Sequence, residues 1–502
     1  MLFQVFQNPR PAKTAPETPV ANEAAILLPK AVSDYQNPAV RLEAENSLLG
    51  LSPQNVQLIR TAMEAQFAKI TAEISNRDPE TARHLPKSAW DADDDAQFQF
   101  LLSIIHLGAN RRNALGITYG TDNSTIPQTP NQTMEKGTGD CDDLCLLLKM
   151  AARSLDIHAA EGLVLVAASY SFPTNLSPGQ NKTGVSGIGH AFFLRPGGDE
   201  EPAQLIDPIC LFSPTYDEPV VELDFNPSAR HLGSDSDFVL YVSGNKSLAL
   251  GMLKFFGIPL AGGGDFTVHY SFTGYSDLLA YYAHQAGYGA VQNNDFSAAA
   301  SMLRFCGSED YDRQSVRAFS LIKAKPPDLK TALDLSDWLM GVEKPGSEVP
   351  YFISFVYQAA GNLQKSYEAA LKSWENRPSD VWEHARLLVR LVGTLINLTQ
   401  PLVSEMFDSS QKPADAKAHQ KRLDTFRLYE KYSRQLMALD PSRDVSWAQA
   451  LAVYGYERSM DAPLPFTESD DFVRVAAILE RDAAQNEAFI SLISKIQFVR
   501  TR

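Results

Sequence analysis

The 502-residue sequence predicts an α+β fold, in which helices pack on an antiparallel sheet, followed by an all-α C-terminal domain. Three observations lead to this class. A strong helical pattern over residues 141–155 is followed by β-type apolar runs at 162–170 and 190–195. After a hairpin-like break, a third short apolar run covers 203–209. Beyond about residue 275 the strand patterns give way to alanine-rich amphipathic segments, and one helix followed by several antiparallel strands is an α+β order.

Composition limits the function classes that the chain can have. Hydrophobic residues make up 44% and charged residues 21%, which is typical of globular proteins. At about 100–200 residues per domain, a chain of this length holds roughly two to four domains. The formal net charge of −15 argues against binding to nucleic acid or to an anionic membrane through a general basic surface. Four cysteines are too few for a disulfide scaffold.

The N-terminal segment, residues 1–45, is expected to be a flexible lead-in, because it carries six prolines and only short apolar runs. It lacks the charged-then-apolar order of a secretory signal peptide. The apolar run at 249–264 is interrupted by Lys254 and Pro259 and is too short to span a bilayer. We therefore expect a soluble chain with no membrane span, located in the cytoplasm unless it is exported by a non-classical route.

Two helices are expected before the first strand-like region. The first follows Ser52-Pro53, a cap and first-turn pair, and its apolar residues recur at helical spacing from Val56 to Ile70. The second follows the acidic run at 91–95, which suits the positive end of a helix dipole. Residues 119–140 then have the composition of a loop.

The C-terminal helical domain, residues 275–502, shows a weak internal period. Ala298, Ala332 and Ser366 are spaced 34 residues apart, which is the tetratricopeptide period. The segment 350–378 fits such a repeat best, but the preceding unit fits poorly and the period is lost afterwards. Packed helices without a repeat explain the pattern almost as well, so both interpretations stay open.

The segment Gly-Thr-Gly-Asp-Cys-Asp-Asp-Leu, residues 137–144, carries the chemistry. A glycine-rich turn delivers Cys141 to the first turn of a helix, where unpaired N–H groups and the positive dipole end favour a thiolate. His190 begins a strand 49 residues later, and Asp207 lies 17 residues further on, near the end of the next strand. Adjacent antiparallel strands would set these two residues side by side. Asp207 would then orient the imidazole, and His190 would act as the base for Cys141.

Other residues near this segment have weaker signals. Asp140 and Asp142 are expected to cap the helix and bond loop backbone, because their charge opposes a thiolate. Gln132 could donate a hydrogen bond to an oxyanion. Cys145 lies one helical turn from Cys141, but no second ligand pair accompanies it, so we interpret it as a core residue. We therefore expect no metal and no cofactor.

Together, Gly-Asp-Cys-Asp-Asp, Gly-His-Ala-Phe-Phe and Leu-Ile-Asp-Pro resemble the transglutaminase-like superfamily of cysteine enzymes, over about residues 95–245. The resemblance implies a papain-like core whose nucleophile begins a helix that packs on an antiparallel sheet. It also implies that Cys141 is the nucleophile, His190 the base and acid, and Asp207 the orienting group. The corresponding catalytic domain would span residues 46–250.

Such a site would attack an amide of a protein or peptide substrate and form a thioester acyl-enzyme. Transfer to water gives a protease or amidase, whereas transfer to a lysine amine gives a crosslinking transglutaminase. Animal transglutaminases line the amine tunnel with tryptophans, but this sequence has no tryptophan from residue 91 to 337. Hydrolysis is therefore favoured, and we see no calcium loop of the EF-hand type. The helical domain would recruit or position the substrate.

Two alternatives to hydrolysis stay open. One is a crosslinking transglutaminase. The other is a catalytically degenerate scaffold, in which the triad is vestigial and the helical surface binds a protein partner.

Overall fold

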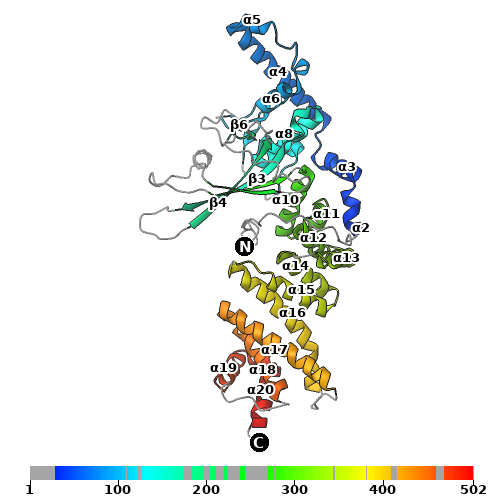
Figure 1. Cartoon of the computed structure of the whole chain (residues 1–502), viewed down its shortest axis with the longest axis vertical. Helices are drawn as coiled ribbons and strands as arrows, with labels where there is room; N and C mark the ends of the chain where they lie inside the picture. The colour runs from blue at the N-terminus through cyan, green and yellow to red at the C-terminus, as the bar shows by residue number, and fades with distance from the viewer. Residues whose placement is uncertain are drawn as a thin grey trace, which may run out of the picture. The chain divides into compact units, whose positions relative to one another are not determined.

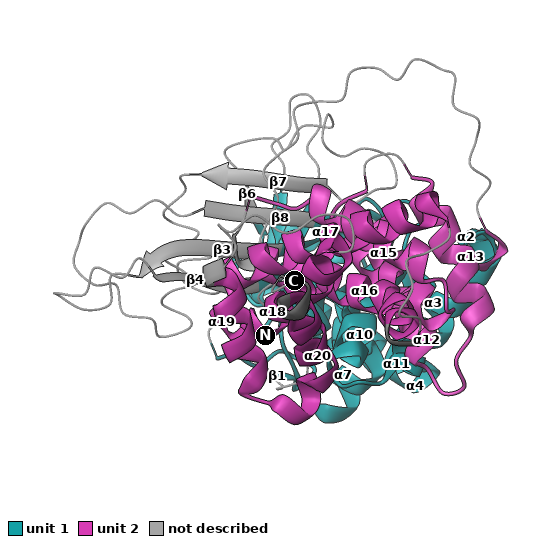
Figure 2. Cartoon of the chain, turned by 90° about the horizontal axis from the view of Figure 1, so that it is seen from below, with its two compact units in different colours: residues 1–24, 32–309 teal, residues 25–31, 310–502 magenta. Residues whose placement is uncertain are grey.

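The computed structural model describes residues 29–108, 110–120, 126–174, 184–195, 204–210, 220–222, 238–243, 269–275, 277–342, 345–379, 381–408, 415–459 and 469–500. Within these ranges the chain is mostly helical and contains a small antiparallel sheet, which supports the α+β prediction at this coarse level. The chain divides into two compact units, residues 1–24 with 32–309 and residues 25–31 with 310–502 (Figure 2).

A six-stranded antiparallel sheet belongs to the first unit (Figure 1). Its strands are β3 (Val164–Thr174), β4 (Gly184–Arg195), β5 (Gln204–Ile206), β6 (Val220–Glu222), β7 (Phe238–Ser243) and β8 (His269–Tyr275). Their order across the sheet is β6-β5-β4-β3-β8-β7, so β8 lies between two strands that precede it in sequence. The apolar runs at 162–170, 190–195 and 203–209 overlap β3, β4 and β5.

Helix α8, Cys141–Ser154, lies at the centre of the first unit and contacts β4. Other helices that contact it include α4 (Pro53–Arg77), α6 (Asp94–Ile105), α7 (Pro130–Lys136) and the short η2 (His158–Ala160). Leu144, Leu147 and Leu148 are fully buried in the shared core. A helix that is apolar on most of its faces is suited to this enclosed position. The first unit also contains α5 (Pro79–Ala82) and η1 (Ala89–Asp91).

Part of the N-terminal segment differs from our expectation of a flexible lead-in over residues 1–45. Residues 30–45 fall in helices α2 (Lys30–Gln36) and α3 (Pro38–Leu49). Pro38 occupies the first turn of α3, where its missing N–H has no intrahelical acceptor to lose, and Asn37 caps that turn at 2.9 Å. Prolines suggested disorder in this segment, but Pro38 instead marks the start of a helix. Residues 1–28 lie outside the described residues.

Helices α10 (Leu278–Gln292) and α11 (Phe296–Leu303) belong to the first unit, although composition suggested a domain boundary near residue 275. The physical reason is that buried side chains of α10 join the same apolar core as α8. Gly287 allows α11 to approach closely, because a Cβ at this position would lie 2.6 Å from Cγ of Leu303.

The second unit is helical throughout its described residues. It comprises α12 (Tyr311–Lys323), α13 (Leu329–Met340), α14 (Glu348–Ala359), α15 (Leu363–Glu375), α16 (Val381–Asp408), α17 (Ala416–Leu439), η3 (Pro441–Arg443), α18 (Asp444–Ser459), α19 (Ser469–Glu480) and α20 (Ala483–Arg500). Ala332 in α13 and Ser366 in α15 are buried, whereas Ala298 belongs to α11 of the first unit.

Within α16, residues Glu383–Met406 are long and apolar enough to cross a membrane by length and composition. Half of this stretch is buried, and Leu388, Leu391 and Leu395 are fully enclosed in the core of the second unit. A helix at the core of a helical domain is also long, apolar and largely buried. Packing within the second unit therefore accounts for the apolar sequence of α16.

The substitution Gly287→Ala is expected to lower the free energy of unfolding by about 1–2 kcal/mol. Overpacking against the buried Leu303 costs roughly 1–3 kcal/mol, and the better helix propensity of alanine returns only about 1 kcal/mol. Urea unfolding measures the change. Gly393→Ala in α16 is the matched control, because its Cβ meets no atom within 4 Å and a gain of roughly 0.5–1 kcal/mol is expected. A Gly287→Ala variant as stable as the wild type would contradict the close packing.

Candidate active site

Cys141 is delivered to the start of α8 by a short, tightly determined segment. Gly137 ends α7 in a left-handed conformation, with φ of 64°, which glycine adopts without strain. The next two residues form β2 (Thr138–Gly139), which pairs in parallel with β1 (Thr118–Tyr119). Gly139 must lack a side chain, because a Cβ would lie 2.9 Å from Thr133 Cγ2. The position of the cysteine is therefore fixed by backbone pairing on one side and by close packing on the other.

The buried carboxylate of Asp143 holds this segment against the preceding loop. It accepts hydrogen bonds from the Gln128 backbone N–H at 2.6 Å and from Gln128 Nε2 at 2.9 Å. It also accepts from the Asp140 backbone N–H at 3.2 Å, which is one half of a capping box. A buried carboxylate is stable only with such donors. Asp143 thus fixes the first turn of α8, to which Cys141 belongs.

His190 and Asp207 lie side by side on neighbouring strands. His190 is part of β4, and Asp207 directly follows β5, whose Ile206 pairs with Phe193 of β4. His190 Nε2 lies 3.2 Å from Asp207 Oδ2, and both side chains are only 1% exposed. The other carboxylate oxygen of Asp207 accepts from the Ile209 N–H at 3.1 Å. One carboxylate oxygen is therefore held by the backbone, and the other lies against the imidazole, which it can orient.

Cys141 is half-buried, and its surroundings favour the neutral thiol. Burial raises the pKa of Cys141 well above its usual value, and the nearby carboxyl groups of Asp142 and Asp140 raise the pKa further. The backbone N–H of Ala191, the residue after His190, donates toward the thiol and opposes this shift. The net direction is upward. Our expectation that the helix start would favour a thiolate at rest is therefore corrected by burial and by the acidic neighbours.

Asp140 differs from an ordinary helix-capping aspartate. Burial raises the pKa of Asp140 to about 10, and a hydrogen bond with Asp142 and the charges of Asp142 and Asp143 add to the rise. At neutral pH Asp140 therefore holds a proton, and the Asp142 carboxylate supplies the negative charge beside the thiol. Asp142 Oδ1 accepts from the Asp143 N–H at 3.1 Å. Asp140, as expected, caps the helix by forming a capping box together with Asp143, while Asp142 borders the cysteine.

Gln132 does not reach the site in the way that the sequence suggested. Its Oε1 accepts from the Thr129 N–H at 2.9 Å, and its own N–H donates to Thr129 Oγ1 at 3.3 Å. These two bonds form a capping box at the start of α7. The Gln132 side chain is exposed, so the oxyanion role is corrected to a helix-capping role. Cys145 is fully buried in the core, as expected.

Two tyrosines that the sequence did not single out face the cysteine. Burial raises the pKa of Tyr119 in β1, and the nearby Cys141 and Asp140 contribute. Tyr281 in α10 donates its hydroxyl to Asp142 Oδ2 at 3.3 Å. Tyr119 begins the segment 119–140, whose composition is that of a loop. Its pairing with Gly139 is a property of the fold, so the sequence did not mark this tyrosine as part of the site. Tyr281 lies 139 residues from its partner, in a region that composition assigned to another domain.

Asp140, Cys141 and Asp142 place their three ligand atoms within 4.8 Å of one another. A metal ion binds deprotonated thiolate and carboxylate groups. The raised pKa values of Cys141 and Asp140 mean that a bound ion would have to displace a proton from each group. We assign no metal to the cluster, whose geometry places a thiol beside two carboxyl groups.

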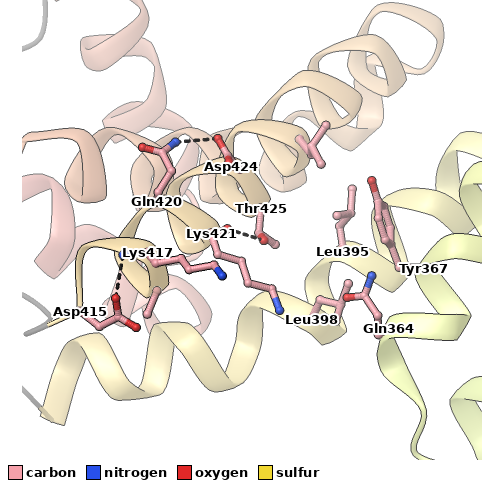
Figure 3. Close-up of a pocket in the computed structure, with 12 residues that line it drawn as sticks. Gln364, Tyr367, Leu395, Leu398, Asp415, Lys417, Gln420, Lys421, Asp424 and Thr425 are labelled. Atoms are coloured by element: carbon pink, nitrogen blue, oxygen red, sulfur yellow. Dashed lines mark hydrogen bonds between the residues drawn. The ribbon is translucent and has the colours of Figure 1, made fainter.

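A separate cavity of about 630 Å³ lies in the second unit (Figure 3). Leucines from α16 and α17 and Tyr367 of α15 form its apolar part. Lys417 and Lys421 line it together with Asp415 and Asp424, so the charges on its wall balance. The described residues that line this cavity include no cysteine and no histidine. Its wall therefore offers binding contacts but no thiol or imidazole for catalysis.

Comparison of the chain with models of protein families, with curated proteins and with solved structures gave no match.

The stability of the first unit is expected to fall as the pH rises from about 4 toward about 10. Over this range the folded state keeps a proton on Asp140, whose pKa is raised from 3.8 to about 10, while the unfolded chain does not. Asp140→Asn removes this titration and should flatten the dependence. Urea unfolding at pH 5 and pH 9 measures it, with the exposed Glu73→Gln as control. Equal pH dependence in Asp140→Asn and wild type would contradict a protonated Asp140.

Proposed function

We propose that this chain is a cysteine-nucleophile amide hydrolase of the transglutaminase-like type, acting on a protein or peptide substrate. One observation carries the proposal. The buried His190–Asp207 pair, 3.2 Å apart, joins two neighbouring strands, and Ala191, the residue after His190, donates its N–H toward the Cys141 thiol. A nucleophile, a base and an orienting carboxylate are the three groups that a catalytic triad uses for acyl transfer.

The proposed reaction begins with a neutral thiol. His190 Nε2 faces Asp207, so Nδ1 is the ring nitrogen that we assign to the thiol proton. The sulfur of Cys141 bonds to the carbonyl carbon as its proton passes to His190. The C–N bond then breaks, His190 returns the proton to the leaving nitrogen, and a thioester remains on Cys141. Backbone N–H groups at the start of α8 are suited to stabilise the oxyanion.

Water completes the cycle. His190 takes a proton from the water, whose oxygen bonds to the thioester carbon, and the C–S bond breaks. The thiol is regenerated as His190 returns the proton to sulfur, and the substrate leaves as a carboxylic acid. The raised pKa of Cys141 favours this general-base route over a resting thiolate–imidazolium pair.

A second candidate function is favoured by the same raised pKa of Cys141. A thiol held neutral by burial and by adjacent carboxyl groups is a weak nucleophile unless the base acts on it. A vestigial site of this kind would leave the chain as a protein-binding scaffold, with partner capture by the helical second unit. Cysteine labelling separates the two functions.

Iodoacetamide labelling, followed cysteine by cysteine by peptide mapping, is expected to modify Cys141 before the three buried cysteines. His190→Ala should slow the labelling of Cys141 at pH 7 by about tenfold or more, because the thiol then loses the base that takes its proton. His158→Ala is the matched control, since this histidine is 71% exposed and pairs with Glu161. Equal rates in His190→Ala and wild type, with both folded by circular dichroism, would leave the scaffold function.

Turnover of a peptide amide is expected to yield the free acid and not an amine adduct. The expectation rests on the absence of tryptophan from residue 91 to 337, which removes the usual lining of an amine tunnel. A glutamine-bearing protein is incubated with the chain and a labelled primary amine. Mass spectrometry then measures how much of the product is free acid and how much is amine adduct. Cys141→Ala should abolish product formation, a loss of about 10³-fold or more. Cys141-dependent incorporation of the amine would instead establish crosslinking.

A further inference from the structure

Helix α10 brings a buried hydroxyl to the start of α8. Tyr281 is 3% exposed, and its hydroxyl donates to Asp142 Oδ2 at 3.3 Å. The pKa of Tyr281 is raised by burial first and then by Asp142 and Cys141, as expected for a phenol that faces both groups. Tyr281 therefore lies against the same end of α8 as the nucleophile.

The position of Tyr281 is fixed from several sides. Asp277 caps α10 by accepting from the Ala280 N–H at 2.9 Å, and it forms an ion pair with Arg41 of α3. The same arginine donates to the Phe305 carbonyl at 2.8 Å, just beyond α11. The ring of Tyr275, at the end of β8, packs edge-on against Tyr281 at 4.9 Å. The hydroxyl is thus presented by a rigid helix and not by a mobile loop.

Both oxygens of the Asp142 carboxylate are engaged. Oδ1 accepts from the Asp143 N–H at 3.1 Å, and Oδ2 accepts from Tyr281. This pair of bonds fixes where the negative charge lies relative to the sulfur of Cys141. The other titratable groups around the thiol are Asp140 at the N-cap of α8, Cys145 on α8, His190 on β4, Asp207 after β5 and Tyr119 on β1.

We propose that Tyr281 is a positioning residue, which holds the Asp142 carboxylate and thereby sets the reactivity of the Cys141 thiol. The proposal rests on the function proposed above and adds α10 to the site. A donated hydrogen bond draws negative charge onto the side of the carboxylate that faces the phenol. Without the hydroxyl, the carboxylate keeps its hydrogen bonds with Asp140 and with the Asp143 N–H, but more of its negative charge stays beside the sulfur. Formation of the thiolate then becomes less favourable.

The pH profile of Cys141 labelling by iodoacetamide tests this role. In Tyr281→Phe the pH profile of labelling should shift to higher pH by about half to one unit. At pH 8 this shift corresponds to a labelling rate that is lower by roughly three- to tenfold. Asp142→Asn should shift the profile to lower pH, because the repelling charge is gone. In the Asp142→Asn background, Tyr281→Phe should have no further effect, since the bonded carboxylate is absent.

Tyr282→Phe is the matched control, because this neighbouring buried tyrosine of α10 loses the same hydroxyl, and the carboxyl group that raises its pKa after burial is Asp143 and not Asp142. An unchanged profile in Tyr281→Phe would overturn the proposal. The proposal would also be overturned if Tyr281→Phe shifted the labelling profile equally in the wild-type and Asp142→Asn backgrounds, because the effect would then be structural alone. Cys141 left unlabelled up to pH 10 in every variant would also overturn it. The His190→Ala comparison tests the proposed function separately, because it does not involve Tyr281.

Discussion

The buried carboxylate of Asp143 is the interaction on which the site depends. It ties the Gln128 loop, the backbone of Asp140 and the first turn of α8 together through three donated hydrogen bonds. A carboxylate enclosed in this way is costly unless all of its donors are present, so the loop and the helix start can only form together. The packing of α8 on β4 and the contact of Cys141 with Ala191 depend on this arrangement.

The electrostatics around Cys141 combine two opposing influences. The helix start and the Ala191 N–H favour negative charge on sulfur, whereas burial and the flanking carboxyl groups oppose it. Because Asp140 is protonated, Asp142 is the flanking carboxyl group whose negative charge disfavours the thiolate of Cys141. A thiol held neutral in this way is a weak nucleophile, so under the proposed mechanism Cys141 reacts only when the imidazole of His190 accepts its proton.

Sequence reasoning reached the parts of the site that are encoded locally. Cys141 at a helix start follows from the glycine-rich turn, and the juxtaposition of His190 with Asp207 follows from two apolar runs joined as a hairpin. Tyr281 could not be found in this way, because only the packing of α10 against α8 brings it to Asp142. The sign of the Cys141 pKa shift was missed for a similar reason, since burial is a property of the assembled core.

The strand order has a consequence for the biosynthesis of the chain. Strand β3 pairs on one edge with β4, which follows it closely, but its other partner, β8, begins only at His269. A nascent chain leaving the ribosome therefore holds the β3 edge open while the intervening residues are still being made. Open edges recruit foreign strands. The first unit can complete its sheet only after residue 275 has left the ribosome, and a chain that terminated near residue 250 would leave the edge of β3 uncovered and aggregation-prone, one strand away from His190.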